Sequence, residues 1–136
     1  MHVLIADDDL TSLNALSTLL RSWDYQVTAV GDGGRAWQAL LRPDPPLICL
    51  LDRQMPLDGI NLCRRIRTTE ATAKTYVLFI TVRGSKQDLV DGFAAGADDY
   101  VTKPFDRDEL RARLSLGKRV VELQSALSNR PRGKGP

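Results

Sequence analysis

The sequence lacks several features that mark particular classes of protein. Its 136 residues contain no apolar run close to the roughly 20 residues of a membrane-spanning helix. Only a short apolar segment, residues 3–6, precedes three acids at the N-terminus, which is not the pattern of a signal peptide. Internal repeats and low-complexity segments are missing, apart from residues 131–136, which we expect to be a disordered tail. We therefore expect a soluble globular protein that does not associate with membranes.

The sequence contains only two cysteines and one histidine. Cys49 lies within an apolar run and Cys63 within a helical pattern, so both are expected to be buried thiols rather than partners in a disulfide. Free thiols favour a cytoplasmic protein. The single histidine, His2, precedes the first predicted strand and is expected to be inert.

The net charge of +2 conceals an uneven distribution along the chain. Residues 1–106 carry 11 Lys and Arg against 14 Asp and Glu, whereas residues 107–136 carry 8 against 3. A basic end can contact nucleic acid or an acidic partner. A solvated helix face followed by a loose terminus explains the same pattern more simply, so we expect no direct nucleic-acid binding by this domain.

Short apolar runs alternate with amphipathic helical patterns. Strands are predicted at residues 3–6, 26–30, 47–51, 76–81 and 99–101. Helices are predicted over 10–22, around 36–41 after a turn at 31–34, from 58–59 onward, from an N-cap at Ser85 to Gly96, and from a capping box at Asp106 and Glu109. Leu89, Val90, Phe93 and Ala94 are taken as the apolar face of the fourth helix. The alternation predicts an α/β fold with a doubly wound, five-stranded parallel sheet.

Reactive side chains stand at the ends of four predicted strands. Asp7 and Asp8 follow the first strand, Asp52 the third, Thr81 ends the fourth, and the fifth leads into Lys103. In a sheet of order 2-1-3-4-5 these four strands are neighbours, and their carboxyl ends meet at the switch point where such sheets bind ligands. The sequence therefore predicts one cluster made of these residues.

Three carboxylates in one cluster must either take up protons or hold cations. Lys103 supplies one positive charge, and the remaining candidate ligands are hard oxygens without His or Cys, which favours Mg²⁺ over Zn²⁺. Mg²⁺ commonly bridges protein carboxylates to phosphate oxygens. This combination suggests a carboxylate nucleophile that forms an acyl phosphate, with Thr81 offering a hydroxyl to a phosphoryl oxygen.

Some of these residues also have simpler structural interpretations. One of the three acids, most simply Asp9, can cap the first helix, although a cap does not explain all three. Thr81 can be an ordinary β-branched strand residue, and Tyr100 a packed aromatic side chain. Asp58 is expected to cap the third helix.

Four motifs, taken in this order and spacing, resemble the receiver domain of bacterial response regulators, a CheY-like, flavodoxin-like fold. They are LIADDD at 4–9, LLDRQMPLDG at 50–59, FIT at 79–81 and GADDYVTKPF at 96–105. The resemblance covers residues 1 to about 120 and assigns residues 1–116 to the receiver domain proper. It implies a signalling switch rather than an enzyme, one that catalyses only its own phosphorylation and dephosphorylation.

The resemblance also implies a role for each matching residue. Asp52 corresponds to the phosphoacceptor, and Mg²⁺ is expected on Asp7, Asp8, Asp52 and the backbone carbonyl of Gln54. Thr81 and Tyr100 correspond to the switch pair. Lys103 corresponds to the lysine that contacts the phosphoryl group, and the bond to Pro104 is typically cis. The implied partner is a histidine kinase or a histidine phosphotransfer protein, and the implied change affects the face of the fourth helix, fifth strand and fifth helix, where a homodimer can form.

Two features depart from a bare receiver. Val82 stands where the family usually has a small residue, which bears on access to Asp52. Leu116, Val120, Leu123 and Leu127 continue the last helix at coiled-coil spacing, with Gly117 weakening it. We interpret residues 117–130 as a dimerising linker toward an output domain; the alternative is a helix that folds back on its own domain.

Three other functions compete with this interpretation. A Mg²⁺-dependent phosphohydrolase of the haloacid-dehalogenase type resembles D-x-D-G-T, but Gln54 stands where the second acid is needed. An FMN-binding flavodoxin is disfavoured because three acids after the first strand repel phosphate. A receiver-like module that is never phosphorylated usually loses the acids or the lysine, and this chain retains them.

Overall fold

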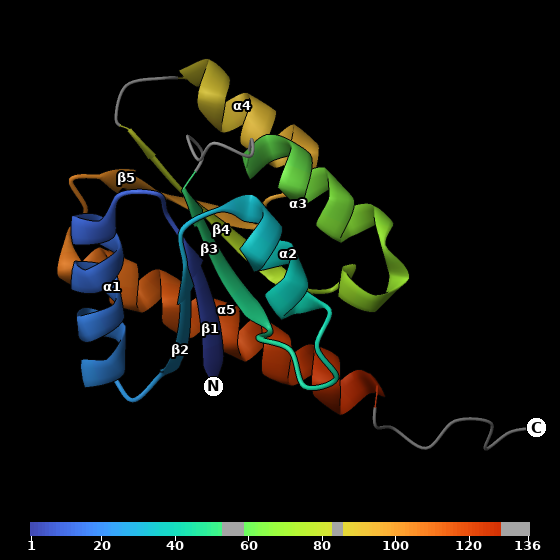
Figure 1. The fold of residues 1–136 in the computed structure, drawn as a ribbon. Coiled ribbons are helices and arrows are strands. Elements are labelled where there is room, and N and C mark those ends of the chain that lie inside the picture. Colours follow the sequence, from blue (N-terminus) through green and yellow to red (C-terminus); the bar gives the residue numbers. More distant parts are fainter. Residues whose placement is uncertain (53–58, 83–85, 129–136) are drawn as a thin grey trace, which may run out of the picture.

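The computed structural model describes residues 1–52, 59–82 and 86–128 (Figure 1). The strands are β1 (His2–Ala6), β2 (Gln26–Val30), β3 (Ile48–Asp52), β4 (Tyr76–Val82) and β5 (Asp99–Lys103). The helices are α1 (Leu10–Ser22), α2 (Gly33–Leu40), α3 (Gly59–Thr68), the 3-10 turn η1 (Glu70–Thr72), α4 (Lys86–Ala95) and α5 (Arg107–Ser128). All strand pairs are parallel, in the order β2-β1-β3-β4-β5. The predicted fold and strand order are confirmed.

Helices cover both faces of the sheet (Figure 1). One buried cluster joins the sheet to α2, α3 and α4, and the other joins it to α1 and α5. Successive strand residues point to opposite faces, so Leu4 belongs to the first cluster and Ile5 to the second. Every residue of β3 is buried, as the apolar run that precedes its final residue, Asp52, predicts for a central parallel strand.

Aspartates begin three of the helices. Asp9 accepts a hydrogen bond from the backbone N–H of Thr11, Asp32 from Arg35 and Asp106 from Glu109. These contacts satisfy backbone donors that the first helical turn leaves unpaired. Because Asp32 is a cap, α2 begins at Gly33, inside the predicted turn.

Gly96 ends α4 as predicted, with φ +110°. A Cβ atom at this position would lie 2.5 Å from Cγ of Arg67, whose Nε donates to the Gly96 carbonyl over 2.8 Å. Conformation and space both require glycine here.

The predicted apolar face of α4 was wrong. Val90 and Phe93 are 51% and 45% exposed and Ala94 is exposed, whereas Gly92 and Ala95 are buried. The physical reason is the ring of Phe79 on β4, which lies 3.3 Å from the place of a Cβ on Gly92. Small residues let α4 approach this ring closely, so Gly92 and Ala95 are buried against the sheet. Leu89 is only half-buried, and Phe93 stays 45% exposed although its ring meets that of Tyr100 on β5 edge-on.

Two sets of residues lie side by side along α5. Leu110, Leu114, Gly117 and Val121 are buried against the sheet. Leu116, Leu123 and Leu127 are exposed by 42%, 64% and 61%, with Val120 half-buried. Thus the helix packs on its own domain beyond residue 116. Of the predicted coiled-coil positions, Leu116, Leu123 and Leu127 are exposed, whereas Val120 packs against the buried cluster between the sheet, α1 and α5.

Cys49 and Cys63 are buried free thiols, as predicted, and burial raises the pKa of Cys63 to about 11. Among the described residues, none of the helices combines the length and apolar composition that a membrane crossing requires. Gln54, Asp58, Ser85, the Val82 side chain and the tail at 131–136 lie outside the described residues.

Candidate functional site

The register of the sheet brings the predicted reactive residues to one edge. Ala6 pairs with Leu51, Asp52 with Ile80, and Val82 with Lys103. Asp7 follows Ala6 directly, so Asp7, Asp52, Thr81 and Lys103 all stand at the carboxyl ends of neighbouring strands. We call Asp7, Asp8, Asp52 and Lys103 the acidic site.

Asp7 is completely buried at the end of β1. Its Oδ1 accepts a hydrogen bond of 2.9 Å from the backbone N–H of Asp9, and its Oδ2 accepts one of 3.1 Å from Nζ of Lys103. Burial raises the pKa of Asp7, and the neighbouring Asp52 raises it further, against the opposing effects of these two donors. The surroundings of Asp7 therefore disfavour its charged form.

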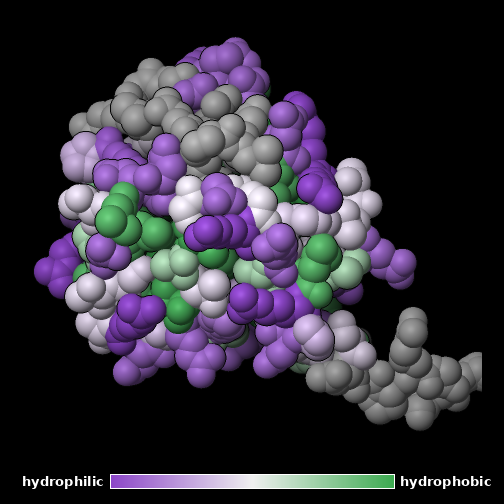
Figure 2. All heavy atoms as spheres, in the orientation of Figure 1, coloured by the Kyte–Doolittle hydropathy of each residue, from purple (hydrophilic) through white to green (hydrophobic). Residues whose placement is uncertain are grey.

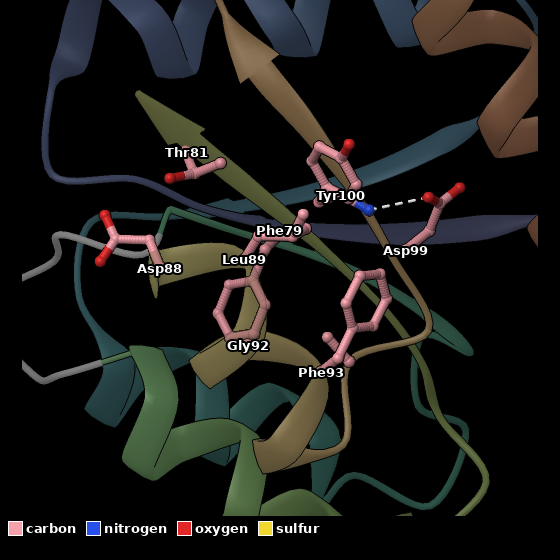
Figure 3. A pocket seen from close by; sticks show the side chains of 9 residues that line it. Phe79, Thr81, Asp88, Leu89, Gly92, Phe93, Asp99 and Tyr100 are labelled. Carbon is pink, nitrogen blue, oxygen red and sulfur yellow. Dashed lines mark hydrogen bonds between the residues drawn. The ribbon is translucent and has the colours of Figure 1, made fainter. Parts of the chain in front are cut away.

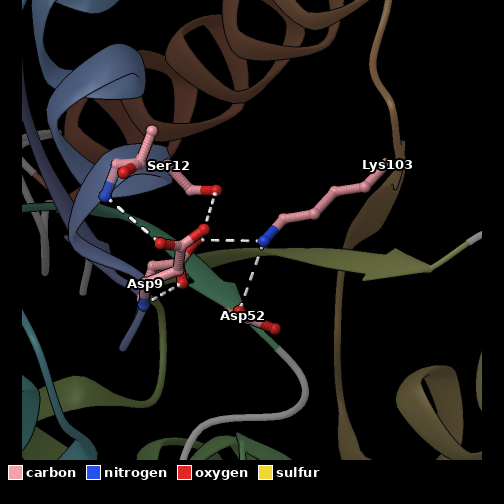
Figure 4. A network of polar contacts seen from close by, with 6 residues as sticks. Asp9, Ser12, Asp52 and Lys103 are labelled. Atoms are coloured by element: carbon pink, nitrogen blue, oxygen red, sulfur yellow. Dashed lines mark hydrogen bonds and ion pairs between the residues drawn. The ribbon is translucent and has the colours of Figure 1, made fainter.

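Lys103, the last residue of β5, joins the two buried acids (Figure 4). Its Nζ lies 3.1 Å from Oδ2 of Asp7 and 3.4 Å from Oδ2 of Asp52. Burial lowers the pKa of Lys103, but the hydrogen bond to Asp7 and the charge of Asp52 outweigh burial and raise it overall. The Lys103–Pro104 bond is cis, as the family resemblance implies.

Asp8 completes a set of oxygens that fits a divalent cation. One carboxylate oxygen each from Asp7, Asp8 and Asp52 lies within 4.8 Å of the others. Asp7 and Asp52 are buried, and Asp8 is the exposed member of the set. Three carboxylates outnumber the one ammonium group, and an all-oxygen donor set suits Mg²⁺.

Asp9 stays outside this set. Its carboxylate accepts hydrogen bonds from the Ser12 hydroxyl over 2.9 Å and from the Thr11 backbone over 3.2 Å (Figure 4). The bond from Ser12 lowers the pKa of Asp9. Its structural role as the α1 cap is confirmed.

Thr81 and Tyr100 line the same small hollow between β4, β5 and α4 (Figure 3). Thr81 is buried and Tyr100 is half-buried. Asp88, Leu89 and Phe93 of α4 form the opposite wall. The structure thus brings the predicted switch pair to one hollow next to the acidic site.

A polar contact beside Tyr100 was missed by reasoning from the sequence. Arg113 of α5 pairs with Asp99 of β5 over 2.7 Å, and its guanidinium lies 5.6 Å from the centre of the Tyr100 ring. No local sequence pattern predicts this contact, because Arg113 belongs to α5 and its partners belong to β5, and only packing brings these two elements together.

The chain matches the model of one protein family, described as the response regulator receiver domain, over residues 3–115. It is 40% identical over 116 residues to the DNA-binding dual master transcriptional regulator RpaA of Synechocystis, an alignment that covers 83% of this chain and 47% of that protein. The chain spans about half the length of the curated relatives it matches.

Solved structures show the same fold. A putative response regulator from Chloroflexus aurantiacus superposes with a TM-score of 0.81 at 34% identity, covering 89% of this chain and 97% of the other. The receiver domain of a sensor histidine kinase from Pseudomonas aeruginosa, solved with a magnesium ion coordinated in its active-site cleft, gives a TM-score of 0.76 at 29% identity, with coverage of 89% and 97%. This chain belongs to the response regulator receiver domain family.

Proposed function

We propose that this chain is a phosphorylation-activated switch in which Asp52 accepts the phosphoryl group from a histidine kinase or histidine phosphotransfer protein. The observation that carries the proposal is the ammonium group of Lys103, which lies between buried Asp7 and Asp52 while Asp8 faces solvent beside them. Such an arrangement is costly for a purely structural site, since it gathers three anions around one cation.

In this function, an Asp52 carboxylate oxygen forms a bond to phosphorus. The bond from phosphorus to the donor imidazole nitrogen breaks, and its electron pair returns to that nitrogen. Lys103 faces the phosphoryl oxygens and stabilises their charge, and the Thr81 hydroxyl donates to one of them. Mg²⁺ bound to Asp7, Asp8, Asp52 and the Gln54 carbonyl would neutralise the charge on these oxygens.

The response of the domain follows from the position of Thr81. If Thr81 moves toward a phosphoryl group, it leaves the wall of the hollow that it shares with Tyr100, and Tyr100 changes its position. The face formed by α4, β5 and α5 then presents a different surface to a second copy or to an output domain. The domain is regulatory, and we propose that it catalyses only its own phosphorylation and dephosphorylation.

We further propose that residues 117–130 link the receiver to an output domain. RpaA, which is named a DNA-binding regulator, is about twice as long as the region it shares with this chain. The two buried free thiols support a cytoplasmic location.

Mass spectrometry after incubation with a small phosphodonor and Mg²⁺ tests the acceptor role. We expect the wild-type protein to gain the mass of one phosphoryl group, and both Asp52→Asn and wild type with a chelator to gain none. Asp9→Asn is the matched control, since Asn also caps helices and position 9 lies outside the cation set. No gain with any donor favours the alternative of an interaction module that is never phosphorylated.

A further inference from the structure

Arg113 is held in place by two acids. Its Nη1 donates to Oδ1 of Asp99 over 2.7 Å, and its Nε donates to Oε1 of Glu109, one turn earlier on α5, over 3.1 Å. The hydrogen bond to Asp99 is the main cause that raises the pKa of Arg113; burial opposes it, and the bond to Glu109 adds to the rise. The orientation of the guanidinium plane is therefore set by contacts at two points.

Asp99 is a rigid anchor for this pair. It is 8% exposed, and its Oδ1 also accepts a hydrogen bond of 2.8 Å from the backbone N–H of Tyr100 (Figure 3). Within the described ranges its Oδ2 has no hydrogen-bond partner. A buried carboxylate in this situation depends on its ion pair, so Arg113 and Asp99 stay together.

The same guanidinium covers the ring of Tyr100. Its carbon lies 5.6 Å from the ring centre, within the range of a cation–π contact. Phe93 of α4 meets the ring edge-on, with centroids 6.0 Å apart at 85°. Tyr100 is thus held between a cation from α5 and an aromatic ring from α4, at one end of the hollow that also reaches Thr81.

We infer that Arg113 is a positioning residue that holds Tyr100 in this place and couples its movement to α5. The inference rests on the proposed switch function. When Tyr100 moves into the hollow toward Thr81, it leaves the face of the guanidinium, so the contact favours the unphosphorylated arrangement. Because Arg113 belongs to α5, the loss of this contact when Tyr100 moves changes the interactions of α5 as well, which couples the position of the ring to that helix.

Fluorine NMR of protein labelled with 3-fluorotyrosine tests this inference. The chain has three tyrosines, and Tyr100→Phe identifies the resonance of Tyr100. The test variant is Arg113→Met, which keeps the length of the side chain. The matched control is Arg111→Met, since Arg111 lies on the same helix and its guanidinium also covers an aromatic ring, that of Trp23, at 5.5 Å.

In Arg113→Met without donor, we expect the Tyr100 resonance to move toward its position in the phosphorylated wild type. The equilibrium between the two positions should change about two- to fivefold, which corresponds to one cation–π contact at a partly exposed site. By linkage, the affinity for beryllofluoride with Mg²⁺, a non-covalent analogue of the phosphoryl group, should rise by a similar factor. Arg111→Met should leave both quantities unchanged. Arg113→Lys, which keeps the charge but not the planar group, should give an intermediate result and serves if Arg113→Met does not fold.

A Tyr100 resonance that stays at the wild-type position in both Arg113 variants would overturn the inference, as would equal shifts in the Arg111 and Arg113 variants. The solvent isotope shift of this resonance, measured without donor, should fall in the Arg113 variants because the ring becomes less exposed. This measurement tests the contact even if Asp52 accepts no phosphoryl group, and the mass gain of the wild type tests the acceptor role separately.

Discussion

Asp7 and Asp52 share one cation, Lys103, and this arrangement determines how single residues respond to pH and metal. Burial raises the pKa of Asp7 above the ordinary value of 3.8, so the folded protein takes up this proton at a higher pH than the unfolded chain. The stabilisation from this proton is full below the unfolded pKa and is lost as pH rises through the folded pKa. When Asp7 is charged, its carboxylate therefore depends on a nearby cation, either Lys103 or a bound metal ion, for stabilisation.

Magnesium should stabilise the folded protein more at neutral pH than in mild acid, because protonated Asp7 is no longer a metal ligand. At ten times its dissociation constant Mg²⁺ adds about 1.4 kcal/mol to the free energy of unfolding. This amount corresponds to a rise of roughly 4 °C in Tm. We expect calorimetry to show a smaller rise in Tm in mild acid than near pH 7.5.

Two variants separate this effect from general acid sensitivity. Asp7→Asn should show little rise in Tm with Mg²⁺ at either pH, whereas Asp9→Asn should behave as the wild type. An equal response of the wild type at both pH values would contradict a role for Asp7 as a metal ligand.

Removing the lysine should expose the repulsion between the two buried acids. We expect Lys103→Met to lower the free energy of unfolding by about 1–3 kcal/mol in chelator, less than for a fully buried pair, because the Lys103 side chain is 27% exposed. Mg²⁺ should restore part of the loss, since it replaces the missing positive charge. Denaturant titration with and without Mg²⁺ measures both effects, and Lys118→Met, at an exposed position of α5, is the control. A Lys103→Met protein that is as stable as the wild type in chelator would show that Lys103 does not offset repulsion between Asp7 and Asp52.

At the scale of elements, α5 illustrates how one small residue sets the approach of a helix to a sheet. Gly117 lies against Tyr76 at the start of β4, and a Cβ at position 117 would lie 2.8 Å from two ring carbons. A glycine in a helix interior costs about 1 kcal/mol relative to alanine. The close packing of α5 on Tyr76 explains why α5 contains a glycine at position 117. This packing continues along the helix to Val121, which is 4% exposed.

Gly117→Ala should therefore destabilise the fold although alanine favours helices. We expect a net loss of about 1–2 kcal/mol, because overpacking of a core exceeds the gain in helix propensity. Chemical denaturation measures this loss. Gly31→Ala is the matched control, since no atom lies within 4 Å of the place of its Cβ. Adding Tyr76→Leu to Gly117→Ala should recover part of the loss through the space it creates; a double variant with simply additive losses would exclude the clash as the cause.

At the scale of the whole molecule, several large apolar side chains are exposed to solvent, and contact with another protein surface would bury them. The face seen in Figure 2 is mainly hydrophilic, with its apolar atoms in separate patches. On α5, Leu123 and Leu127 are 64% and 61% exposed and lie in line with Leu116 and Val120. This line has the spacing of a coiled-coil seam, and it extends the proposed interface of α4, β5 and α5.

We expect the protein to self-associate through this seam, more strongly after phosphorylation. Leu123→Glu combined with Leu127→Glu should raise the dissociation constant at least tenfold, or about 1.4 kcal/mol, because charges replace apolar contacts. Analytical ultracentrifugation over a range of concentrations measures this constant. Ser125→Glu adds a charge on another face of the same two turns and should change little. A wild-type protein that remains monomeric at all concentrations, with and without donor, would exclude the dimer.

The sequence by itself determined the order of strands and helices, the parallel sheet and the membership of the acidic site. These features follow from short-range information: apolar runs that end in acids, capping aspartates and a topology in which the ends of neighbouring strands must meet. Asp7, Asp8, Asp52, Thr81 and Lys103 could be assigned to one edge of the sheet because each lies within two residues of a strand end.

Only the tertiary structure decided which apolar face of a helix turns inward and which polar side chains meet across elements. α4 packs on the sheet through Gly92 and Ala95 because the Phe79 ring of β4 fills the space between the helix and the sheet. The sequence of α4 alone carries no information about that ring. Arg113 reaches Asp99 and Tyr100 because Gly117 and Leu114 set how α5 lies on the sheet. Such contacts depend on the distance between packed elements, which no local sequence pattern encodes.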